Sequence, residues 1–157
     1  MTFTTRAGTL LTLLLLLLAA PASAQQVWQV MAKMGAGGTW AGDCSAGANP
    51  SNWLITYYVD KTGVARRLAN RGPTESKLNS TIDSSQKLTP TTFLMRIRND
   101  DANWGQNDQM AFDTVIEITP SGMRTLSSIR VGDGQQFIKD GNFTSNGNPA
   151  TTFQRCK

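Results

Sequence analysis

The side chains that carry most enzyme chemistry are scarce in this chain. Its 157 residues include no His, which excludes Ser-His-Asp and Cys-His catalysis and His-ligated zinc, because each needs an imidazole as base or ligand. Asp113 and Glu117 lie on one face of a predicted strand, about 13 Å apart along it. The two carboxylates of a glycosidase lie closer together, about 5 to 9.5 Å apart. We therefore expect a protein that is not an enzyme and that holds no cofactor.

Candidate metal-binding side chains lie in residues 99–108, where Asp and Asn supply oxygens of the kind that Ca²⁺ accepts. The EF-hand spacing fails, because Gly105 comes one position early and Phe112 stands where the closing Glu belongs in a loop starting at Asp101. We interpret the segment as a solvated loop with no metal site. Trp104 within it is predicted to contact a ligand or partner at the rim of the domain, since an exposed indole is otherwise costly.

The first 24 residues have the pattern of an export signal. They carry Arg6 near the start, a leucine-rich apolar run, and the sequence Ala-Ser-Ala at the end, which together predict a Sec signal peptide cleaved after Ala24. The apolar run is about 11 residues long and would span only about 16 Å, too short for a transmembrane helix. No Cys follows the cleavage site, so we expect no lipid anchor. Residues 25–157 should form a single β-rich domain, periplasmic or secreted.

The charge balance gives little support for nucleic-acid binding. The formal net charge is +4, and removal of Arg6 with the signal would lower it to +3. The densest basic group, Arg66, Arg67 and Arg71, is interpreted as an exposed hairpin rim. We expect neither a nucleic-acid partner nor a membrane span.

The two cysteines, Cys44 and Cys156, lie near the two ends of the exported part. Export would place them where disulfides persist. A reactive thiol would need an activating base or a Cys-x-x-Cys spacing, and the sequence has neither His nor that spacing. We therefore predict a structural disulfide.

The hydrophobic periodicity predicts a short helix followed by strands. Val27, Met31 and Met34 recur at helical spacing within residues 25–34. After that the period changes to two, which is typical of half-buried strands. Strong strands are predicted at 52–59, 92–98, 110–118 and 123–131, and weaker ones around Trp40 and at 64–68, 77–82, 136–139 and 151–156.

The connections between these strands are short and turn-like, with no helical crossover of the length that parallel strands need. We therefore predict an all-β, antiparallel up-and-down barrel of about eight strands, with a short N-terminal helix. A β-sandwich is the alternative, because either arrangement covers the edges of a long meander.

Gly38-Thr39-Trp40, at the start of the first predicted strand, resembles the calycins, the lipocalin-like and avidin-like barrels. In those families a Gly-x-Trp motif begins the first strand, the Trp closes one end of the barrel, and an Arg from the last elements stacks on the indole. The resemblance implies these closing roles for Gly38, Trp40 and Arg155. It covers three residues and a strand pattern. The second lipocalin motif has no clear counterpart, so no ligand identity is implied.

The disulfide and the Arg–Trp stack constrain each other. In ideal strands Cys44 shares a face with Trp40, whereas Cys156 lies on the face opposite Arg155. If both features are present, we expect a bulge or a non-strand end near them.

Our leading functional hypothesis is an exported barrel that binds a small apolar or amphipathic ligand without a covalent bond. The alternative is a protein-interaction or inhibitor module that acts through Trp104 and the Arg66–Arg71 rim and has no cavity, since a barrel of this size can be filled by its own side chains. A hollow interior would favour the ligand-binding barrel, and a filled one would favour the interaction module. The ligand-binding candidates inside the barrel are Trp53, Ile55, Tyr57, Phe93, Met95, Phe112 and Ile116.

Overall fold

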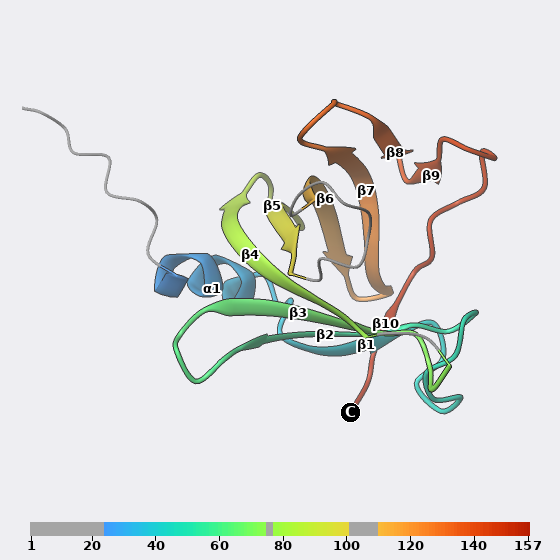
Figure 1. The fold of residues 1–157 in the computed structure, drawn as a ribbon, viewed down its shortest axis with the longest axis horizontal. Helices are drawn as coiled ribbons and strands as arrows, with labels where there is room; N and C mark the ends of the chain where they lie inside the picture. The colour runs from blue at the N-terminus through green and yellow to red at the C-terminus, as the bar shows by residue number, and fades with distance from the viewer. Residues whose placement is uncertain (1–23, 75–76, 101–109) are drawn as a thin grey trace, which may run out of the picture.

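The computed structural model describes residues 24–74, 77–100 and 110–157 (Figure 1). The structure is mostly β, as predicted, and within these residues ten strands form one antiparallel sheet in the order β10-β1-β2-β3-β4-β5-β6-β7-β8-β9. The strands are β1 (Gly38–Ala41), β2 (Leu54–Val59), β3 (Ala65–Asn70), β4 (Leu78–Lys87), β5 (Thr92–Asn99), β6 (Ala111–Thr119), β7 (Gly122–Arg130), β8 (Gln136–Lys139), β9 (Asn142–Phe143) and β10 (Gln154–Arg155).

The sheet curls into a half-barrel, and the expectation of a closed barrel of about eight strands is wrong. The closing strand predicted at 151–156 is reduced to β10, which pairs with β1 over two residues. On the other side, Met123 of β7 and Phe153 form an isolated bridge with two backbone hydrogen bonds of 2.8 Å. No continuous ladder therefore joins β7 to β10 in the described residues. Because the strands form one sheet, the two-sheet sandwich is also wrong.

Alternating side chains show which face of the sheet is buried. In β5, Phe93, Met95 and Ile97 are all buried, whereas Arg96 and Arg98 lie on the other face. The register shifts between Ile82 and Ser84, Val115 and Ile116, and Ser128 and Ile129. Such β-bulges bend and twist a sheet, which favours the strong curl of this one.

The predicted N-terminal helix is present as α1 (Ala24–Lys33). It ends in a Schellman motif: the Ala36 amide donates to the Met31 carbonyl, and the Gly35 amide donates to the Ala32 carbonyl. Gly35 has a φ of 75°, a conformation that glycine adopts at little cost. The turn therefore leads the chain directly from α1 toward β1.

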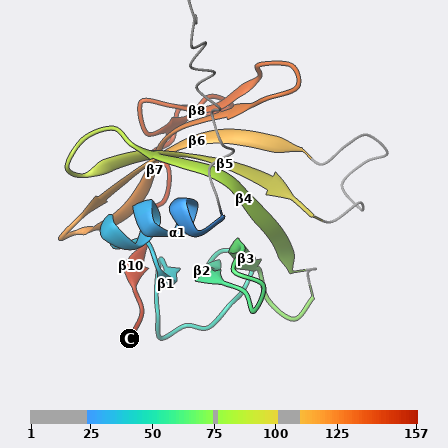
Figure 2. The same ribbon diagram turned by 90° about the vertical axis from the view of Figure 1, so that its left-hand side faces the viewer.

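In Figure 2, α1 lies between β1–β3 on one side and β4–β8 on the other. Val27 and Met31 are 2% and 0% exposed and belong to the core cluster formed with the sheet. Ser85 of β4 donates a 2.7 Å hydrogen bond to the Val27 carbonyl. The helix thus fills one part of the concavity and attaches to the middle of the sheet.

Cys44 and Cys156 form the predicted disulfide, with their Cα atoms 5.4 Å apart. Both lie beyond the ends of β1 and β10. The non-strand ends allow Trp40 and Arg155 to be register partners on one face, with the Arg155 guanidinium carbon 5.8 Å from the centroid of the Trp40 ring. The geometric conflict between the disulfide and the stack is resolved in this way.

The predicted signal peptide, apart from Ala24, lies outside the described residues. Among the residues that are described, none belongs to a helix with the length and apolar character needed to cross a bilayer.

Candidate ligand-binding cavity

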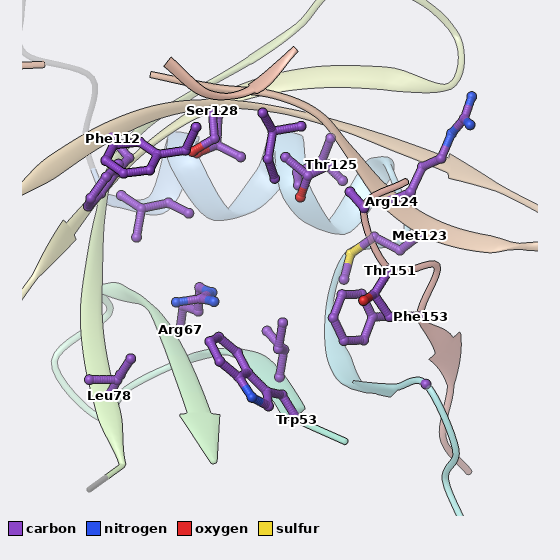
Figure 3. Close-up of a pocket in the computed structure, with 18 of the residues that line it drawn as sticks. Trp53, Arg67, Leu78, Phe112, Met123, Arg124, Thr125, Ser128, Thr151 and Phe153 are labelled. Atoms are coloured by element: carbon purple, nitrogen blue, oxygen red, sulfur yellow. The ribbon is translucent and has the colours of Figure 1, made fainter. Parts of the chain in front are cut away.

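The concave face of the sheet borders a cavity of about 480 Å³ (Figure 3). Its wall is mostly apolar and comes from the inner faces of β2 to β7, from the β8–β9 hairpin, and from the segments before β2 and β10. The side chains with apolar surface toward it include Trp53, Ile55, Tyr57, Leu78, Ile97, Phe112, Ile116, Met123, Ile138, Phe143 and Phe153.

Five of the seven ligand-binding candidates predicted from the sequence line this cavity: Trp53, Ile55, Tyr57, Phe112 and Ile116. Phe93 and Met95 do not line the cavity. Their side chains are 1% and 0% exposed, so other protein atoms cover them. Met95 is the register partner of Ser85, which is bonded to α1. These two side chains therefore belong to the packed part of the interior.

The closing residues of the resemblance lie away from the cavity wall. Trp40 is 3% exposed, and its indole N–H donates to the Ala36 carbonyl at 2.8 Å. Arg155 donates to the Gly37 carbonyl at 2.8 Å. Gly38 lies beside the Arg155 guanidinium, which a Cβ at this position would meet at 3.6 Å.

The arginines predicted to form one exposed rim lie in three different places. Arg66 is on the outer face of β3 and pairs with Asp60 at 2.8 Å and Asp100 at 2.9 Å. The Arg71 guanidinium lies over the Trp53 ring, 4.6 Å from its centroid. Arg67 lines the cavity. The prediction of an exposed rim is therefore wrong for Arg67, and Trp104, the other predicted contact, lies outside the described residues.

Sequence reasoning missed Arg67 because the alternation in β3 is ambiguous. The larger apolar side chain, Leu68, has the opposite parity to Arg67, so hydrophobicity places the wrong face inward. The register decides the matter: Arg67 pairs with Tyr57 of β2, whose side chain is 3% exposed. Partners directly opposite each other in an antiparallel pair share a face.

Arg67 belongs to a polar row that crosses the inner face of four strands. Its register partners are Tyr57 on one side and Ser80 on the other, and Ser80 in turn pairs with Asn99. The Ser80 hydroxyl and Asn99 Oδ1 are 2.9 Å apart. Tyr57, Arg67 and Asn99 all line the cavity, so an apolar chamber contains a narrow band of hydrogen-bonding groups.

Burial raises the pKa of the Tyr57 hydroxyl, which an ordinary tyrosine also keeps protonated near neutral pH. Desolvation raises the pKa of Tyr57 above its ordinary value of 10.0, and the neighbouring Arg67 opposes this by its charge and by a hydrogen bond. Burial outweighs the arginine, because the pKa is raised overall. Near neutral pH, Tyr57 is therefore an O–H donor.

Two aromatic side chains of the β8–β9 hairpin mark where the cavity meets solvent. Phe137 and Phe143 line it, and they are 36% and 38% exposed. Phe137 also makes an edge contact with Phe112, with ring centroids 5.8 Å apart. Exposed aromatic side chains at the edge of an apolar cavity are typical of a ligand entrance.

Within the described ranges, no three His, Cys, Asp or Glu side chains come together as a metal site. Comparison of the chain with protein-family models, with curated proteins and with solved structures found no match. The likeness to calycins therefore stays a prediction.

Proposed function

We propose that this protein binds a small amphipathic ligand, without a covalent bond, in the cavity on the concave face of its sheet. The observation that carries the proposal is the hollow, mostly apolar interior of about 480 Å³. Ligand sites usually measure about 300 to 1,000 Å³ and combine apolar walls with a few placed polar groups. At about 30 Å³ for each water-sized group, the cavity has room for on the order of 16 such groups.

The hollow interior favours this function over an interaction module with a filled core. The exposed aromatic side chains, Phe137 and Phe143, border the cavity, so one surface serves both as entrance and as wall. The proposed activity needs no reaction, in keeping with a chain that has no imidazole. We propose that binding takes place in the periplasm or outside the cell, since the leucine-rich start has the pattern of a signal peptide and disulfides persist in those compartments.

Binding can be tested with 12-carbon amphiphiles on residues 25–157 with the disulfide intact. Isothermal titration calorimetry with dodecanoate and dodecanol should show saturable binding of one molecule. Neighbouring serines provide a matched pair of variants, because Ser128 lines the cavity and Ser127 does not. Ser128→Phe should fill space in the cavity and weaken binding by at least about tenfold, while Ser127→Phe should leave it within about twofold. Saturable binding of neither amphiphile, or equal losses in both variants, would overturn the proposal.

A further inference from the structure

Arg67 places a positive charge inside an otherwise apolar chamber. It is half-buried, extends from the inner face of β3, and is flanked on that face by Ala65 and Ala69, both 0% exposed. Figure 3 shows the side chain directed into the space opposite Phe112, Thr125 and Ser128. Because Arg67 lines the cavity, its side chain borders open space that a ligand group can occupy.

Within the described part of the chain, no carboxylate lies within ion-pair distance of Arg67. The arginines that do have carboxylate partners pair on the outer face or in turns, as Arg66 does with Asp60, Arg96 with Asp113, Arg98 with Asp83, Arg124 with Glu117 and Arg130 with Asp133. The described cavity wall contains no Asp or Glu. Its other charged residue, Arg124, has its guanidinium 2.7 Å from the Glu117 carboxylate and directed away from the chamber in Figure 3.

A cation in an apolar chamber is costly unless an anion or hydrogen-bond acceptors accompany it. A guanidinium matches a carboxylate through two parallel N–H···O bonds, a stronger arrangement than a neutral pair. The Tyr57 hydroxyl, beside Arg67 in the same polar row, supplies one further donor. The chamber therefore offers donors and positive charge at one place and apolar surface elsewhere.

We propose that the ligand is a monoanionic amphiphile, an aliphatic carboxylic acid, whose carboxylate binds Arg67 and Tyr57 while its hydrocarbon chain lies against the apolar wall that includes Phe112 and Ile116. This inference rests on the proposed function and specifies its ligand class. The interior arginine then has its counterion only in the complex. The cavity should therefore prefer an anionic head group over a neutral or cationic one. Burial of apolar surface alone does not give such a preference.

The test compares three 12-carbon probes that differ in the head group: dodecanoate, dodecanol and dodecylammonium. In calorimetric titrations at pH 7.5, with each probe below its micelle concentration or solubility limit, dodecanoate should bind at least about tenfold more tightly than dodecanol, and dodecylammonium should bind most weakly. Binding of none of the three overturns both this inference and the proposed function. Binding of all three with equal affinity leaves the proposed function standing and overturns this inference alone.

Two adjacent arginines provide the matched variants. Arg67→Met should remove the preference for dodecanoate and leave dodecanol within about threefold, and retained dodecanol binding also shows that the variant is folded. Arg66→Met, on the outer face, should keep the preference. A preference that survives Arg67→Met would overturn the inference. If Arg67→Met does not fold, the comparison of the three probes on the unmodified protein still tests whether an anionic head group is preferred.

Discussion

Adjacent residues of one strand have opposite electrostatic surroundings in this protein. Arg66 has two carboxylates within 2.9 Å on the outer face, whereas Arg67 enters the cavity beside Tyr57. Successive side chains of a strand point to opposite faces, so a single position decides between an ordinary surface ion pair and a cation available to a ligand. The same alternation separates Tyr57, which is 3% exposed, from Tyr58, which is 38% exposed.

We expect Tyr57 to make the folded protein lose stability above about pH 10. Its pKa in the folded state is raised above 10.0 by burial, while the unfolded side chain titrates at about 10. The folded state then holds the proton more tightly. The contribution of Tyr57 to stability is complete below pH 10 and is lost as the pH rises through the folded pKa. Urea unfolding between about pH 8 and 11 measures this slope, which should be reduced in Tyr57→Phe.

The second tyrosine provides the control. The chain contains two tyrosines, so in Tyr58→Phe the ultraviolet absorbance change of tyrosinate reports Tyr57 alone. We expect the ionisation midpoint of the folded Tyr58→Phe variant to lie above 10. A midpoint at or below 10 would show that the hydroxyl is not buried as the fold places it.

At the scale of elements, the half-barrel depends on a close approach between the start of β7 and the segment before β10. Gly122 has a φ of 140°, and a Cβ there would lie 2.5 Å from the Phe153 carbonyl oxygen. The next residue, Met123, makes the two backbone hydrogen bonds to Phe153. Glycine at position 122 therefore permits the contact that joins β7 to the C-terminal segment.

We expect Gly122→Ala to destabilise the protein more than Gly134→Ala does. Gly134 also has a positive φ, 72°, but a Cβ there would meet nothing within 4 Å. Gly134→Ala should cost only the backbone strain, about 1 to 2 kcal/mol. Gly122→Ala must in addition displace Phe153 and weaken two hydrogen bonds of about 1 kcal/mol each. Equilibrium urea unfolding of both variants measures the difference, and equal losses would mean that this contact contributes nothing to stability.

The strands that alternate strongly were predictable, and those defined by their neighbours were not. The strand predicted at 92–98 matches β5 (Thr92–Asn99) because its second half alternates buried Met95 and Ile97 with Arg96 and Arg98. β4 extends to Lys87, five residues beyond the predicted end. Its second half is polar and forms because β5 supplies a pairing edge and because Ser85 bonds to α1. The two residues of β9 likewise form only against β8.

For the whole molecule, the disulfide is a covalent link at one edge of the sheet, between the segments that follow the neighbouring strands β1 and β10. It joins residues 112 positions apart, and closing a loop of that size is worth about 4 to 5 kcal/mol in the chain-entropy treatment. We expect reduction, or replacement of both Cys44 and Cys156 by Ser, to lower the free energy of unfolding by up to that amount. Urea unfolding with and without reductant measures the loss.

The double Ser variant is the control for the reductant, which should leave its stability unchanged. Thiol titration of the denatured, non-reduced protein should find no free thiol. Two free thiols in exported protein, or an unchanged unfolding midpoint after reduction, would contradict the predicted role of the disulfide.

By itself the sequence determined the properties that follow from residue type, number and spacing: the period of two that makes this protein mostly β, the helical spacing of Val27, Met31 and Met34, the pairing of its only two cysteines, and the exclusion of imidazole chemistry. These properties depend on residue type and on spacing along the chain. Only the tertiary structure decided that the sheet stays open, that α1 packs against β3 and β4, and that Arg67 enters the remaining cavity. Those outcomes depend on the register between strands and on where α1 docks, because contacts between residues distant in sequence leave no periodic signal within either segment.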